Sequence, residues 1–259
     1  MVCSRSRCLR HLPAVLLLGL GTLAGHAQPA NGKSEAPVYG ARDDVMRFAD
    51  EVAARHEGLL DRAWLREQLQ RARQVAAVQR LMMPPPAGTA KNWAAYRARF
   101  VERDRIAAGA AFWRANAAAL ARAEERWGVP ASIVVGVIGV ETYYGRITGG
   151  FRVIDALATL AFDFPTGRRD RTPFFRSELE QFLLWCARER CDAQQVQGSF
   201  AGAMGLPQFM PGSLNRWAVD FDGDGHVNLA GSAADAIGSV ARYLAYFGWR
   251  SAKAGTPRP

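Results

Sequence analysis

The stretch VVGVIGVETYYG, residues 134–145, carries a single charged residue, Glu141, behind a run of apolar ones. A β-branched run with glycines suits a buried strand or a buried helix equally well. Pro130 just before the run and Ser132 as a candidate N-cap favour the helix. An unpaired carboxylate is costly to bury, so such a group either stays protonated or has a function. Both the fold and the function depend on what surrounds Glu141.

The composition describes a globular protein with an anionic partner. The chain has 259 residues, of which 49% are hydrophobic and 22% charged, enough for a substantial core. Its net charge of +9 suits an anionic polymer, either nucleic acid or a cell-surface polymer. No stretch interleaves basic and aromatic residues as single-strand binders do, so we expect no nucleic acid partner.

The N-terminus, residues 1–27, has the pattern of a signal peptide. A basic start is followed by the apolar run LPAVLLLGLGTLAG and by an A-x-A-like cleavage site, GHA. The run is shorter than the roughly 20 residues of a spanning helix, and no other segment is long enough. His26 stands where a lipoprotein signal carries its cysteine. We therefore expect a periplasmic protein that is neither membrane-spanning nor lipidated.

The rest of the chain divides by composition. Residues 28–42 are a loose leader rich in Ala, Gly and Pro, and residues 251–259 are a low-complexity tail. Residues 43–128 carry apolar side chains at helical spacing and predict a helical region. One helix is expected from about Arg62 to the proline break at 82–88, and one or two long helices after it.

A second string, DFDGDGHVNL, follows the pattern of a calcium-binding loop. Asp220, Asp222 and Asp224 stand at loop positions 1, 3 and 5. Gly225 at position 6 allows the sharp turn, and His226 at position 7 offers its backbone carbonyl.

The end of this loop departs from the EF-hand pattern. Position 12, which an EF-hand fills with a bidentate Glu, is Gly231. We expect Asp235 to close an expanded, EF-hand-like loop over residues 220–235. Oxygen ligands on a flexible loop favour Ca²⁺ over Mg²⁺, and the ion would be structural. The alternative is an acidic surface turn without metal.

Two cysteines, Cys186 and Cys191, remain after signal cleavage and could pair in an oxidising compartment. Within one continuous helix their Cα atoms would lie roughly 8 Å apart, too far for a disulfide. A bridge therefore requires the helix to end between them. Two free cysteines are the equal alternative.

Glu141 has the surroundings of a general acid. A carboxyl group at the end of a buried helix, beside Tyr143 and Tyr144, is expected to have a raised pKa because burial penalises its charged form. Breaking a glycosidic bond requires such an acid. The residues alone leave open a structural glutamate held by backbone hydrogen bonds.

A resemblance to a known family favours the acid. The chain resembles the membrane-bound lytic murein transglycosylase B family over about 127–249, and more loosely over 93–125. Four strings in the same order carry this resemblance: GVPASIVVGVIGVETYYGRITGGFRVIDALATLAF, RSELEQFLL, GSFAGAMGLPQFMPGSLNRWAVDFDGDGHVNL and DAIGSVARYL.

The resemblance implies a mainly α fold, with a lysozyme-like catalytic core at 129–250 behind the N-terminal helical region. It implies cleavage of the β-1,4 bond between N-acetylmuramic acid and N-acetylglucosamine of peptidoglycan. The product carries a 1,6-anhydro ring, and Glu141 is the one catalytic carboxylate. No organic cofactor is implied. Peptidoglycan glycan strands are the expected partner, and cell-wall synthesis machinery is a further candidate partner.

Further residues match strings that line the family's glycan groove, and these are Ser199, Gln208 and Tyr243. Tyr143 and Tyr144 either stack on sugar rings or pack in the interior. Arg168 and Arg169 either meet peptide-stem carboxylates or form a solvated turn.

Two departures from the family pattern keep alternatives open. The family continues beyond GWR, whereas this sequence ends in the tail, so we expect a cleft short of one wall. One extra residue before Asp235 puts the last calcium ligand in doubt. The alternatives are a hydrolytic muramidase using the same Glu141 and a non-catalytic peptidoglycan-binding protein. A purely structural calcium module is the weakest.

Overall fold

The computed structural model describes residues 37–84, 88 and 92–250, and it is mainly helical as predicted. The predicted signal peptide 1–27, most of the leader and the tail 251–259 lie outside the described residues. No helix among the described residues combines the length and the apolar composition needed to cross a bilayer.

The N-terminal helices are η1 (Tyr39–Ala41), α1 (Asp43–Arg55), α2 (Arg62–Gln70) and α3 (Ala76–Met82). The expectation of one helix up to the proline break is wrong, because the chain leaves the helix between α2 and α3. There the Arg73 N–H donates to Asp155 (2.8 Å) and the Val75 N–H donates to Thr159 (3.0 Å). These long-range bonds to a buried helix replace the local helical ones.

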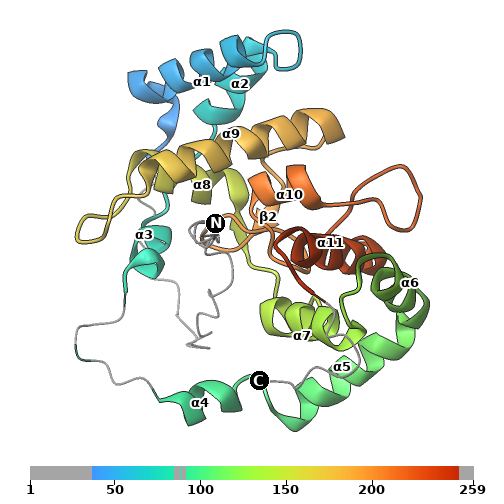
Figure 1. Cartoon of the computed structure of the whole chain (residues 1–259). Helices are drawn as coiled ribbons and strands as arrows, with labels where there is room; N and C mark the ends of the chain where they lie inside the picture. The colour runs from blue at the N-terminus through green and yellow to red at the C-terminus, as the bar shows by residue number, and fades with distance from the viewer. Residues whose placement is uncertain (1–36, 85–87, 89–91, 251–259) are drawn as a thin grey trace, which may run out of the picture.

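Three helices follow where one or two were expected: α4 (Trp93–Ala98), α5 (Arg103–Ala115) and α6 (Ala117–Trp127). In Figure 1, α4 lies at the bottom of the molecule, away from α1 and α2 at the top. The α5 and α6 helices lie beside α7 and α11 at the lower right.

Most of the stretch 134–145 lies in α7 (Ala131–Thr142), so the prediction of a helix there is confirmed. Its start differs from the expectation, because Ser132 does not cap it. The helix begins at Ala131, with Pro130 at the N-cap position, and the Ala131 N–H donates to the Glu124 carboxylate of α6 (3.1 Å). A carboxylate at this end satisfies a free N–H group and interacts favourably with the helix dipole.

The centre of the molecule is α8 (Val153–Phe162), which is almost completely buried. It packs along α9 (Thr172–Glu189), as Figure 1 shows, and α10 (Pro211–Trp217) lies against α9. The last helix, α11 (Ala233–Tyr246), packs on α6 and α7.

Two short strands connect the helices near α7. Strand β1 (Phe151–Arg152) pairs antiparallel with β2 (Gln197–Gly198). This pairing brings the loop after α7 next to the segment between β2 and α10, residues 199–210, which is called the glycine-rich segment below. One hydrophobic cluster runs from Tyr39 to Tyr243 and includes buried side chains from each of these helices except α4 and α5. The division into regions 43–128 and 129–250 stays a prediction.

Candidate active site

Glu141 occupies the last turn of α7, and two side-chain hydrogen bonds fix that turn. The Thr142 hydroxyl donates to the Leu206 carbonyl (2.8 Å), which ties the helix to the glycine-rich segment. From α5, the Arg105 guanidinium donates to the Gly139 carbonyl (2.6 Å). A cation at a helix C-terminus satisfies a free carbonyl and matches the helix dipole. The position of Glu141 is thus set from two sides.

The Glu141 side chain lines an apolar cavity between three segments. Val137 comes from α7 itself, Pro207 and Phe209 from the glycine-rich segment, and the other wall comes from α11. The α11 side chains in this wall are Val240, Tyr243 and Leu244. Among the described residues that line the cavity, Glu141 is the only carboxylate.

This environment changes the acidity of Glu141. Burial among apolar side chains raises its pKa from 4.5 to about 7, because the charged form loses its hydration. Within the described part of the chain no hydrogen bond or nearby charge offsets that burial. The structural alternative required backbone hydrogen bonds to the carboxylate, and none is found among these residues. Near neutral pH the group can therefore both give and take a proton.

Tyr243 is the predicted groove residue that lies closest to this chemistry, since it lines the same cavity as Glu141. It is buried in an aromatic cluster, with ring centroids 5.3 Å from Phe209, 5.2 Å from Trp217 and 4.6 Å from Phe247. Burial raises the pKa of its hydroxyl, which therefore stays protonated.

Ser199 and Gln208 lie in the glycine-rich segment, and both organise its backbone. The Ser199 hydroxyl accepts hydrogen bonds from the N–H groups of Ala201 (3.3 Å) and Ala203 (3.0 Å). The Gln208 amide donates to the carbonyls of Thr148 (3.1 Å) and Gly205 (3.0 Å). Both side chains remain partly exposed, but neither lines the Glu141 cavity.

The two adjacent tyrosines have different surroundings. Tyr143 lies between two guanidinium groups, with Arg105 4.2 Å and Arg146 4.7 Å from its ring centroid. Tyr144 packs between α5 and α7, where its hydroxyl occupies the space that a Cβ on Gly109 or Gly139 would need. The Tyr144 ring thus packs between two helices and the Tyr143 ring lies against arginines, and both residues are partly exposed.

The arginine turn lies at a different place. Arg168 donates a hydrogen bond to the Met82 carbonyl at the end of α3, and Arg169 is exposed. Neither lines the Glu141 cavity.

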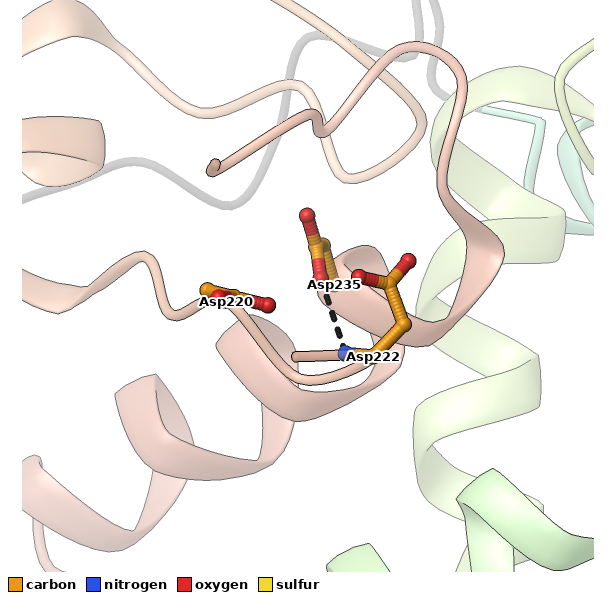
Figure 2. A group of neighbouring side chains, drawn as sticks. All are labelled: Asp220, Asp222 and Asp235. Atoms are coloured by element: carbon orange, nitrogen blue, oxygen red, sulfur yellow. Dashed lines mark hydrogen bonds between the residues drawn. The ribbon is translucent and has the colours of Figure 1, made fainter. Parts of the chain in front are cut away.

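The acidic loop brings three of the predicted metal ligands together. Carboxylate oxygens of Asp220, Asp222 and Asp235 all lie within 4.8 Å of one another (Figure 2). Asp235, in the first turn of α11, is buried, and its carboxylate accepts the N–H groups of Phe221 and Asn228, both at 2.7 Å. It thereby holds the two ends of the loop together.

The carboxylate of Asp224 lies outside this group, and the backbone carbonyl of His226 stays a predicted ligand. The Asp224 carboxylate accepts the His226 N–H (2.8 Å), which tightens the turn. The His226 side chain, which was not the predicted ligand, lies 3.8 Å from the Glu189 carboxylate of α9. Gly225 adopts φ 92°, in the left-handed region that the sharp turn was predicted to need.

Converging carboxylates with two exposed members fit a hard cation that prefers oxygen ligands. Asp220 also accepts the N–H groups of Gly225 and Gly223, which lower the pKa of its carboxyl and keep it ionised. The site can therefore offer charged oxygens without protonation.

The transglycosylase SLT domain model matches residues 40–257, which is most of the chain. The chain belongs to the transglycosylase SLT domain family. Its sequence is 44% identical, over 214 residues, to membrane-bound lytic murein transglycosylase B of Escherichia coli (strain K12). That match covers 80% of this chain and 57% of the relative, so the chain spans little more than half of the relative's length.

Two solved structures place the same SLT domain fold in relatives. Soluble lytic transglycosylase SltB1 from Pseudomonas aeruginosa is 44% identical, with a TM-score of 0.75 over 83% of this chain and 69% of that one. Escherichia coli lytic transglycosylase Slt35, solved in complex with calcium, is 42% identical, with a TM-score of 0.75 over 87% of this chain and 70% of that one.

Sequence reasoning missed the cavity walls and the cap on α7. Val240, Tyr243 and Leu244 stand at positions i, i+3 and i+4 of one helix, so the apolar face of α11 was a usable signal. Phe209 also forms part of the wall beside Glu141. For Arg105 we find no local signal, because its partner is a backbone carbonyl of another helix.

Proposed function

We propose that this SLT domain is a lytic transglycosylase, which cleaves the β-1,4 bond between N-acetylmuramic acid and N-acetylglucosamine in peptidoglycan. Family membership and the name of the Escherichia coli relative support the reaction class. One observation carries the mechanism, namely that Glu141 lines an apolar cavity without a second carboxylate and has a pKa of about 7.

In the first step, protonated Glu141 acts as a general acid. Its proton goes to the glycosidic oxygen as the bond from that oxygen to C1 of the muramic acid breaks. The electron pair of the bond stays on the leaving sugar, and positive charge develops at C1 and the ring oxygen. A carboxyl group with a pKa near 7 remains protonated in a useful fraction at neutral pH.

In the second step, the Glu141 carboxylate acts as a general base. The C6 hydroxyl of the same muramic acid attacks C1 and gives its proton to Glu141, which closes the 1,6-anhydro ring. The enzyme returns to its starting state and no water is consumed. Most glycosidases need a second carboxylate as nucleophile or as base for water. A nucleophile supplied by the substrate removes that need.

For glycan binding we propose Ser199, Gln208, Tyr243 and Tyr143. Tyr243 supports the floor beside Glu141, and the partly exposed Tyr143 ring offers an apolar face to a sugar. The polar side chains of Ser199 and Gln208 lie on the segment tied to α7 through Thr142. Tyr144 is left out of the binding set because its hydroxyl end packs between α5 and α7.

A structural Ca²⁺ is proposed for the acidic loop. Asp220, Asp222 and Asp235 would hold it, with Asp224 and the His226 carbonyl as further ligands from the loop pattern. When bound, the ion would neutralise the converging carboxylates. The loop connects α10 to α11, and α11 supplies one wall of the Glu141 cavity.

We place this activity in the periplasm, with glycan strands as the substrate and cell-wall synthesis machinery as a candidate partner. The predicted signal peptide and the positive net charge support this placement.

The test is mass spectrometry of the products released from purified sacculi by the full chain and by two variants. Glu141→Gln removes the proton but keeps the shape of the side chain. We expect it to lower the release of anhydro-muropeptides by about 100- to 10,000-fold. The matched control is Glu178→Gln, which changes a buried carboxyl hydrogen-bonded to the Gly212 N–H and outside the Glu141 cavity. This control should keep the activity.

Three results would contradict the proposal. Hydrated reducing ends would identify a hydrolytic muramidase. Retained binding to sacculi without any product from the unmodified chain would identify a binding protein. Equal activity of the Glu141→Gln variant and the unmodified chain would show that Glu141 is not catalytic.

A further inference from the structure

The C-terminal turn of α9 places two cysteines at special positions. The helix ends at Glu189 because Arg190 adopts a left-handed conformation, with φ 52°. The N–H groups of Arg190 and Cys191 both donate to the Cys186 carbonyl, the latter at 3.0 Å. The second of these bonds is the 6→1 bond of the Schellman motif, which frequently brings the side chains at the first and last positions of the turn into contact. Here those side chains are Cys186 and Cys191.

The backbone hydrogen bond limits the separation of the two residues. Adding standard bond lengths on either side of the 3.0 Å Cys191 N to Cys186 O distance places the Cα atoms about 7 Å apart at most. Disulfides usually span Cα separations of roughly 4.4 to 6.8 Å. A continuous helix would have separated the two residues further. The helix end that a bridge requires is therefore present.

The two thiols differ in access and in acidity. Cys186 is completely buried, whereas Cys191 is partly exposed. The hydrogen bond between the two side chains lowers the pKa of the Cys191 thiol and, together with burial, raises that of Cys186. Cys191 is thus the thiol that a reagent can reach, and the adjacent Cys186 is the thiol that can resolve a mixed disulfide.

We propose that Cys186 and Cys191 are a modification site, which a disulfide-type oxidant converts from the two free thiols of this structure to an intramolecular disulfide. The Cys191 thiolate attacks one sulfur of the oxidant, and the first thiolate of the oxidant leaves. Cys186 then loses its proton and attacks the Cys191 sulfur, and the second thiolate leaves. Two protein thiols are oxidised and one disulfide of the oxidant is reduced to two thiols.

The bridge would fix the path from α9 to β2. The segment between them is already anchored, because the Gln194 N–H donates to Asp192 (2.9 Å) and the Gln194 amide donates to the Gln68 carbonyl (3.0 Å). A disulfide would add a covalent tie at its start, six residues before β2. This inference does not depend on the proposed function, since it concerns the thiols and not the reaction at Glu141.

The experiment uses the full chain with Cys3→Ser and Cys8→Ser, so that only these two thiols remain. The protein is incubated with oxidised or with reduced glutathione and then denatured and alkylated, and its mass is measured by mass spectrometry. We expect the oxidised sample to take up no alkylating agent. Its mass should be that of the unalkylated dithiol protein minus two hydrogens. We also expect it to melt about 5 °C higher than the reduced sample.

The matched control adds Cys191→Ser, which leaves the buried Cys186 as a lone thiol. Its melting temperature should not respond to the glutathione couple. Two alkylated cysteines in the oxidised sample would overturn the proposal. So would a mass increase from bound glutathione, or a covalent dimer that contains Cys191.

Discussion

Two carboxylate sites in this molecule, the Glu141 cavity and the acidic loop, use the same chemical group in opposite ways. Glu141 lies among apolar side chains, and burial alone raises its pKa to about 7. Asp220 lies beside Asp222 and Asp235, yet backbone N–H groups lower its pKa. Asp220 thus keeps its charge although other carboxylates lie beside it, while the isolated Glu141 becomes able to hold a proton. Hydrogen-bond donors decide this difference more than the proximity of other charges.

Glu178 is an intermediate case between these two sites. It is buried, and its pKa is raised, but the Gly212 N–H donates to its carboxylate at 2.7 Å. Its role is to cap the start of α10. A buried carboxyl group is therefore not by itself a catalytic one, and the absence of a donor distinguishes Glu141 among these residues.

The largest effect is expected from pH, because the proton on Glu141 contributes to folding. Between pH 4.5 and about 7 the folded protein holds a proton that the unfolded chain releases. Stability from this group is complete below pH 4.5 and is lost as pH rises to about 7. The Glu141→Gln variant has no such proton to lose. The unfolding free energy of the variant minus that of the unmodified chain should therefore be about 3 kcal/mol larger at pH 8 than at pH 4.5. Denaturant unfolding at both pH values measures this gain, and parallel pH profiles would contradict the account of the cavity.

Removal of calcium addresses the other side of the comparison. A bound ion stabilises the folded chain by about 2.7 kcal/mol at 100 times its Kd, so a chelator should lower the melting temperature by about 5–10 °C. Asp222→Asn should abolish the response, because it removes one of the three converging carboxylates. Glu125→Gln, an exposed carboxylate on α6, is the matched control and should leave the response intact. The absence of a calcium-dependent shift in the unmodified chain would refute the metal site.

The smallest effect comes from giving Glu141 a partner. Val137 lines the cavity one helical turn before Glu141, and Val137→Thr adds a hydroxyl of nearly the same shape. A donor to the carboxylate favours its charged form, so the alkaline limb of the pH–activity profile should move down by about one pH unit. Val140→Thr makes the same change on an exposed side chain of the same helix and should leave the profile in place. Identical shifts in both variants would show that the cavity is not the cause.

Local patterns sufficed where the determinants are close in sequence. Apolar spacing and Pro130 indicated α7, and the spacing of the aspartates indicated the loop. Long-range partners were not predictable from one sequence. The break between α2 and α3 depends on Asp155 and Thr159 of α8, so no local signal marked it.

The site follows the same division. Glu141 was singled out by the apolar run before it and Tyr243 by a matched string, yet their shared cavity depends on how α11 packs on α7. The sequence left sugar stacking and interior packing equally open for Tyr143 and Tyr144, and only the structure shows that their surroundings differ. A single step along the chain turns one ring toward two arginines and the other into the space between two helices.

The packing of Tyr144 has a consequence for how this sequence can evolve. Its hydroxyl takes the place of a side chain at both Gly109 and Gly139, which lie on different helices. A methyl group on either glycine would force the tyrosine ring to move, and loss of the ring would open a cavity that both positions border. The three residues therefore constrain one another, and we expect substitutions among them to be tolerated mainly in combination.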